Sequence, residues 1–167
     1  MIQKKVCMIG AFATGKTSLV ARYVRGIYSE KYQTTIGVKI DKKVVQTAQQ
    51  TVNLILWDIY GEDEFQRLKL SYLRGASGFI LVIDGTRLET LSVALDLHQK
   101  VRETLGPVPF VAILNKLDLR EDWEVAPDHI ADMKAQGWDL LFGSAKTGLG
   151  VEDCFGRLTQ KMLMETP

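Results

Sequence analysis

Residues 10–17 read GAFATGKT, which matches the phosphate-loop pattern G-x-x-x-x-G-K-[ST]. The apolar run Lys5–Ile9 precedes this stretch, and the helical pattern Thr17–Arg25 follows it. A glycine at each end lets the backbone curl so that successive N–H groups face inward, toward phosphate oxygens. The first turn of the following helix adds partial positive charge. The sequence therefore predicts a strand, a phosphate-binding loop and a helix, in that order.

Each residue type in this loop has a chemical reason. Backbone N–H groups of Ala13, Thr14 and Gly15 are expected to bind phosphate oxygens. Lys16 is expected to place its ammonium group on the β- and γ-phosphates, and the Thr17 hydroxyl to ligate Mg²⁺. The alternative is a chance glycine-rich turn, but the flanking strand and helix favour a true phosphate loop.

The rest of the chain alternates short apolar runs with helical patterns. Further strands are predicted at Leu54–Trp57, Phe79–Ile83, Phe110–Leu114 and Leu140–Phe142, and a hairpin at Val38–Val45 and Thr51–Trp57. One helix is predicted from an apolar stripe of Leu88, Leu91, Leu95, His98, Val101 and Leu105, and another from Val151, Phe155, Leu158 and Met162. This alternation predicts a doubly wound, mostly parallel α/β sheet, whose ligands bind beyond the carboxyl ends of the strands.

Composition limits the classes of protein to consider. The 167 residues contain 46% hydrophobic and 25% charged side chains, no linker and no repeat, so one domain over residues 1–167 is expected. The net charge of +1 gives no electrostatic argument for nucleic acid. No stretch approaches the roughly twenty apolar residues of a membrane span. Cys7 and Cys154 are expected to be buried free thiols of a reducing compartment.

The end of the chain, residues 162–167, carries no cysteine and no polybasic run. We therefore expect a cytoplasmic protein without an anchor of its own. Contact with a membrane would then come through a partner or through a tail that the sequence lacks.

Three residues are candidates for sensing Mg²⁺ and the γ-phosphate. Asp58 ends an apolar strand, and Gly61 follows to complete the pattern D-x-x-G. The carboxylate is expected to hold Mg²⁺ through water, and the Gly61 N–H to reach the γ-phosphate. Thr35 precedes Ile36-Gly37 in the loop before the hairpin, where its hydroxyl is expected to complete the Mg²⁺ shell. A threonine in a surface loop is also ordinary loop chemistry, so this role stays a hypothesis.

Two later segments predict recognition of guanine. Asn115, Lys116 and Asp118 form an N-K-x-D pattern after a predicted strand. The Asp118 carboxylate can accept both the N1–H and the 2-amino group of guanine, a donor pair that adenine lacks. The Lys116 stem is expected to cover the base and Asn115 to brace the loop. After the last strand come Ser144, Ala145 and Lys146, and the Ala145 N–H is expected to donate to guanine O6.

Together these residues resemble the Ras superfamily of small GTPases. Residues 57–62 (WDIYGE) are similar to the family's W-D-T-A-G-Q, and residues 71–78 (SYLRGASG) to the S-Y-Y-R-G-A-x-G of Rab-type members. The resemblance implies a P-loop G domain with six strands and five helices, and Mg²⁺-dependent binding of GTP and GDP. It further implies that Tyr28 packs on the guanine and that Ser18 touches the α-phosphate. Switch loops at residues 27–38 and 59–74 would bind an effector, an exchange factor and an activating protein.

Three positions depart from the family pattern. Glu62 stands where the family has the glutamine that orients the attacking water, and Phe12 stands where most members have a small residue. Ile59 and Tyr60 replace a small Thr-Ala pair. With Lys16, Glu62 is the candidate catalytic residue, but its negative charge faces a polyanion and slow hydrolysis is expected. The alternatives are that repulsion raises the pKa of Glu62 until it protonates, or that it turns to solvent while another group orients the water.

Three functions remain open from the sequence. The first is a switch controlled by GTP and GDP, with slow intrinsic hydrolysis. The second is a constitutively GTP-bound interaction module. The third, a P-loop ATPase or kinase, is disfavoured by Asp118 and by the lack of a nucleoside-binding lid.

Overall fold

A six-stranded sheet runs through the centre of the molecule in the computed structural model, which describes residues 1–29, 37–59 and 69–164. Its strands are β1 (Ile2–Gly10), β2 (Val38–Gln46), β3 (Thr51–Ile59), β4 (Gly78–Asp84), β5 (Phe110–Asn115) and β6 (Leu140–Phe142). Their order across the sheet is β2-β3-β1-β4-β5-β6. Only the β2–β3 pair is antiparallel among the strand pairs of these residues. The predicted mostly parallel sheet and its hairpin are confirmed.

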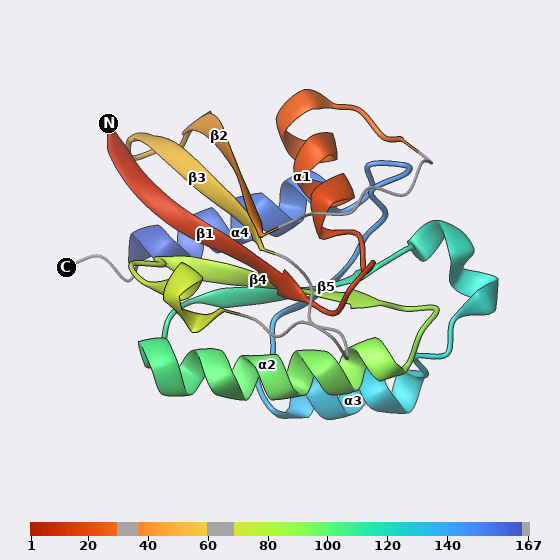
Figure 1. Cartoon of the computed structure of the whole chain (residues 1–167). Helices are drawn as coiled ribbons and strands as arrows, with labels where there is room; N and C mark the ends of the chain where they lie inside the picture. The colour runs from red at the N-terminus through yellow and green to blue at the C-terminus, as the bar shows by residue number, and fades with distance from the viewer. Residues whose placement is uncertain (30–36, 60–68, 165–167) are drawn as a thin grey trace.

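Helices cover both faces of this sheet. They are α1 (Lys16–Arg25), α2 (Glu89–Leu105), α3 (Pro127–Ala135) and α4 (Val151–Met164), with short 3₁₀ helices η1 (Leu70–Leu73) and η2 (Leu117–Asp122). Helices α1 and α4 pack on one face, and α2 and α3 on the other (Figure 1). The described part of the chain thus holds four α-helices, where the family resemblance implied five. Two separate hydrophobic cores result, one on each side of the sheet.

The buried face of α2 differs from the predicted stripe. Leu88 lies just before the helix and is 36% exposed, and Leu95 is 40% exposed. The residues that pack on the sheet are Leu91, Ala94, Leu97 and Val101. The prediction was therefore wrong at Leu88 and Leu95 and missed Ala94 and Leu97, whereas Leu91 and Val101 of the predicted stripe are buried. Ala94 was passed over because its small side chain adds little to an apolar pattern. The predicted stripe of α4 is confirmed, since all four of its residues are buried.

The cysteines are buried as expected. Both Cys7 and Cys154 are free thiols, and burial raises the pKa of each to about 12. They are therefore inert at neutral pH. In the described ranges, no helix has the length and apolarity that crossing a membrane requires.

The carboxyl ends of four strands meet at one edge of the sheet. Strand β1 ends at Gly10, β3 at Ile59, β4 at Asp84 and β5 at Asn115. The phosphate loop, Asp58 and the N-K-x-D segment therefore come together at the same edge, as a doubly wound sheet requires of its ligand site.

Candidate functional site

The phosphate loop follows β1 and packs closely against the ends of β4 and β5. A Cβ atom at Gly10 would lie 2.5 Å from the Val82 carbonyl oxygen. Gly15 has φ of +103°, and a Cβ there would lie 2.3 Å from the Asn115 amide nitrogen. Ala13 also has positive φ, at 61°. Left-handed residues in such a loop turn successive N–H groups toward one side, which makes a cradle for an anion.

Lys16 lies at the base of this cradle and is 6% exposed. Its ammonium group donates to the carbonyl oxygens of Gly10 (3.3 Å) and Ala11 (3.0 Å). Burial lowers its pKa to about 8, the charge of Asp58 works against this shift, and the charge of Arg87 adds to it. A cation that has lost its water in this way is suited to bind a negatively charged phosphate.

Thr17 and Asp58 meet beside Lys16. The Thr17 hydroxyl donates to the Asp58 carboxylate at 2.5 Å, and Asp58 is 1% exposed. A hydroxyl and a carboxylate brought together at a phosphate loop form the hard oxygen donor set that Mg²⁺ prefers. These two predicted metal ligands therefore fit the ion. The third, Thr35, lies outside the described residues, as do Gly61, Tyr60 and Glu62.

A cavity of about 160 Å³ opens next to the loop. It is lined by Gly15, Ser18, Tyr28, Asn115, Lys116, Asp118, Leu119, Ala145 and Lys146. Four separate segments of the chain thus converge on one pocket. All of its lining residues except Leu119 are site residues expected from the sequence or from the family resemblance. Leu119 follows Asp118 directly and adds an apolar wall, for which the sequence offered no separate signal.

Hydrogen bonds hold the residues that are predicted to recognise the base in place. The Asn115 amide donates to the Thr14 carbonyl (2.9 Å) and accepts from the Ala145 N–H (3.3 Å). The Ser144 hydroxyl donates to the Asp118 carboxylate (2.7 Å). Ser144 is fully buried and is not among the residues that line the cavity, so its place is behind Asp118 rather than against a ligand.

Arginine and tryptophan side chains support this pocket from outside. Arg22 donates to the carbonyl oxygens of Ala145 (2.8 Å) and Lys146. The Trp123 indole N–H donates to the Lys116 carbonyl (2.9 Å), and its ring lies against Gly85. The supporting role of Trp123 depends on its contact with Gly85, directly after β4, which sequence spacing does not reveal.

A second group of residues was missed at the end of β4. The fully buried Asp84 carboxylate accepts from Lys116 (2.7 Å) and Arg87 (3.0 Å). Arg87 also donates to the Phe12 carbonyl oxygen (2.6 Å). Phe12 itself is half-buried at the crest of the phosphate loop. Neither Asp84 nor Arg87 belongs to any of the motifs from which the site was predicted.

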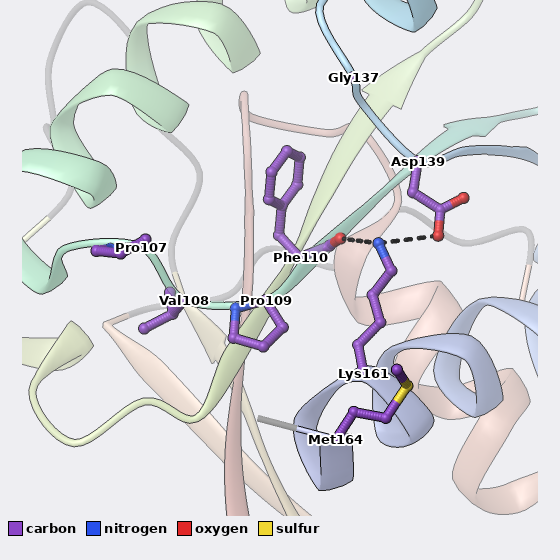
Figure 2. A pocket seen from close by; sticks show the side chains of 8 residues that line it. All are labelled: Pro107, Val108, Pro109, Phe110, Gly137, Asp139, Lys161 and Met164. Carbon is purple, nitrogen blue, oxygen red and sulfur yellow. Dashed lines mark hydrogen bonds and ion pairs between the residues drawn. The ribbon is translucent and has the colours of Figure 1, made fainter. Parts of the chain in front are cut away.

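A larger cavity of about 320 Å³ lies at the opposite edge of the sheet, where β5 and β6 begin. Figure 2 shows Lys161 between the Phe110 carbonyl and Asp139, to which it bonds at 3.2 and 3.0 Å. Asp139 also pairs with Arg157 at 2.7 Å. The charges of this cavity are thus engaged with one another, whereas the smaller cavity at the carboxyl edge combines a phosphate loop with a base pocket.

The sheet order and the loop after β1 define a P-loop nucleotide-binding domain.

Comparison with known proteins identifies the family. The profile of the Ras family matches residues 5–164. The chain is 35% identical to human Ras-related protein Rab-32 over 96% of its length and 75% of that protein, and 34% identical to bovine Ras-related protein Rab-7b over 97% and 83%. Human Ras-related protein Rab-7L1 is 34% identical over 95% of the chain and 82% of its own length.

The chain therefore belongs to the Ras family and is a Rab-like small GTPase. Members of this family bind GTP and GDP, usually with Mg²⁺, and act as nucleotide-dependent switches.

Proposed function

We propose that this domain, residues 1–167, binds GDP and GTP with Mg²⁺ at the carboxyl edge of the sheet and hydrolyses GTP slowly. The observation that carries the proposal is the pocket in which Asp118, Lys116 and Ala145 lie beside the phosphate loop. A carboxylate in such a pocket selects guanine, because it can accept from the N1–H and the 2-amino group together.

The residues of the site divide the work between base and phosphates. Asp118 and the Ala145 N–H would read guanine, with Tyr28, Lys116 and Lys146 packed around it. N–H groups of residues 13–17, the Ser18 backbone or hydroxyl, and the Lys16 ammonium group would bind the phosphates. Thr17, Asp58 and Thr35 would hold Mg²⁺, which supplies charge neutralisation at the β- and γ-phosphates when bound. Gly61 would sense the γ-phosphate.

Slow hydrolysis follows from the chemistry of Glu62. A glutamine amide accepts from the attacking water and donates to the γ-phosphate, whereas a carboxylate only accepts. The repulsion between the Glu62 carboxylate and one phosphate charge about 4 Å away is about 1 kcal/mol in water. It is about 4 kcal/mol at an effective dielectric constant near 20. That corresponds to roughly one to three decades in rate. Phe12, at the loop crest, would further occupy the space an activating arginine needs.

Single-turnover hydrolysis of GTP by the wild type and by Glu62→Gln tests this claim. We expect the variant to hydrolyse GTP about ten- to a thousandfold faster. Equal rates would show that Glu62 does not limit the reaction. The alternative function is a module that stays bound to GTP, with negligible hydrolysis. This alternative would be favoured if the wild type retained bound GTP over many hours while Glu62→Gln converted it to GDP.

Partners are proposed to bind at switch loops 27–38 and 59–74 and at the sheet face beside them. In the described part of that face, Ile40 is 48% exposed, and the rings of Trp57 and Tyr72 lie 6.3 Å apart. The Lys5 ammonium group lies 3.6 Å from the centre of the Trp57 ring. An apolar surface with a cationic rim suits an effector with apolar and acidic side chains. We propose a cytoplasmic location, with membrane contact through such a partner or through a tail outside this sequence.

A further inference from the structure

We propose that Asp84 and Arg87, in the turn between β4 and α2, are positioning residues for nucleotide retention: they fix the peptide groups at the crest of the phosphate loop. The inference rests on the proposed binding of guanine nucleotides at this site. It adds two residues that do not line the nucleotide pocket and that act through the phosphate loop and through Lys116.

Asp84 is the centre of this arrangement. One carboxylate oxygen accepts from the Thr86 N–H (2.9 Å) and hydroxyl (2.7 Å). The other accepts from Lys116 (2.7 Å) and from the Arg87 Nε (3.0 Å). Asp84 is fully buried, so these four donors replace the water that it has lost. A carboxylate with two cationic partners orients both of their side chains.

The two cations each extend from Asp84 to the phosphate loop. Arg87 donates through Nη2 to the Phe12 carbonyl oxygen at 2.6 Å. Lys116 donates to the next carbonyl oxygen, that of Ala13, at 3.4 Å. The carbonyl oxygens on either side are bonded as well, Ala11 by Lys16 and Thr14 by Asn115. Four consecutive carbonyl groups of the loop are thus held by side chains.

Holding a carbonyl group fixes the N–H group of the same peptide. A trans peptide is planar, and its C=O and N–H point in opposite directions. The bond from Arg87 to the Phe12 carbonyl therefore sets the direction of the Ala13 N–H, and the bond from Lys116 to the Ala13 carbonyl sets that of Thr14. These N–H groups are the ones proposed to bind phosphate. Without Arg87, the peptide between Phe12 and Ala13 loses this charged donor, and its orientation is less firmly fixed.

The first measurement is the rate at which a fluorescent GDP analogue dissociates from the full chain in the presence of Mg²⁺. We expect Arg87→Ala to release it about 5- to 50-fold faster than the wild type, since a hydrogen bond from a charged group is lost. Arg87→Lys keeps the charge without the planar fork and should fall between the two. The control is Arg157→Ala, which removes an Arg–Asp pair at the opposite edge of the sheet and should leave the rate within twofold.

The second measurement is the ³¹P NMR spectrum of bound GDP, which a general loss of stability does not change. We expect the β-phosphate resonance to move in Arg87→Ala and Arg87→Lys but not in Arg157→Ala. The inference would be overturned if both Arg87 variants had the GDP dissociation rate and the β-phosphate resonance of the wild type. It would also be overturned if Arg157→Ala changed both quantities as much as the Arg87 variants do. If Arg87→Ala does not fold, Arg87→Lys alone decides by the same criteria. Wild type that binds no GDP would overturn the proposed function as well.

Discussion

The ammonium group of Lys16 is buried in protein before any phosphate reaches it. Burial lowers its pKa from about 10.5 to about 8, so the folded chain holds this charge at a cost in stability. Binding sites often carry such strain, since a group that is unfavourable in the free protein becomes favourable with its ligand. The strain makes Lys16 accessible to a measurement that needs no nucleotide.

The quantity to compare is the free energy of unfolding of the nucleotide-free wild type minus that of Lys16→Met. We expect this difference to rise by about 3 kcal/mol between pH 8 and pH 10.5. In this range the unfolded chain still binds a proton that folded Lys16 has released, so stability rises with pH. The buried thiols and Tyr23 have raised pKa values and act in the opposite direction, but they are common to both proteins. Urea unfolding of both proteins across this pH range gives the difference. If the free energies of unfolding of the two proteins changed with pH in the same way, this prediction would be contradicted.

Ser144 lies outside the pocket but holds Asp118, a residue that lines it. Its hydroxyl donates to the Asp118 carboxylate at 2.7 Å and accepts from the Thr147 N–H at 3.1 Å. The Ser144 hydroxyl thereby fixes the direction of the Asp118 carboxylate, which we propose reads guanine, and ties the loop after β6 to the N-K-x-D segment.

We expect Ser144→Ala to weaken binding of GDP about 5- to 50-fold, because the carboxylate loses a charge-assisted hydrogen bond and its fixed direction. Isothermal titration with GDP measures this change. The matched control is Ser92→Ala on the exposed side of α2, which should bind GDP as the wild type does. A dissociation constant unchanged in Ser144→Ala would show that Asp118 is positioned without it.

At the scale of elements, the site depends on how closely the β4–α2 turn approaches the N-K-x-D segment. Gly85 lies under the ring of Trp123, whose indole N–H holds the Lys116 carbonyl. The Gly85 carbonyl oxygen accepts from the N–H groups of Glu124 and Val125. One glycine therefore lets the β4–α2 turn lie directly against the N-K-x-D segment.

We expect Gly85→Ala to lower the free energy of unfolding by about 1–3 kcal/mol, because its Cβ would lie 2.1 Å from the Trp123 ring. The displaced ring should also change tryptophan fluorescence. Gly156 in α4 is the opposite case, since a Cβ there meets nothing within 4 Å. Gly156→Ala should raise stability by about 0.5–1 kcal/mol through better helix propensity. Similar effects of both substitutions would contradict the close packing at Gly85.

Over the whole molecule, local pattern was enough to predict most of the fold and much of the pocket. The phosphate loop, Asp58 and Asn115–Asp118 carry their chemistry in short motifs, and the alternation of strands and helices predicts that strand ends bring them together. The hairpin was predicted because its two strands are adjacent in the sequence.

Contacts between distant segments were harder to predict. Asp84, Arg87 and Trp123 act through partners 32, 75 and 7 residues away, and nothing in their own spacing indicates those partners. The buried face of α2 was predicted only in part for a related reason, since Ala94 gains its importance from the sheet and not from its own hydrophobicity.

The nucleotide carried by the purified protein tests the central claim most directly. The protein is prepared in Mg²⁺, denatured, and its released nucleotide identified and quantified by chromatography. We expect about one guanine nucleotide per chain, as GDP or as a mixture of GDP and GTP that reflects slow hydrolysis. An adenine nucleotide, or a chain that carries no nucleotide and binds no added GDP, would contradict the assignment of this pocket to guanine.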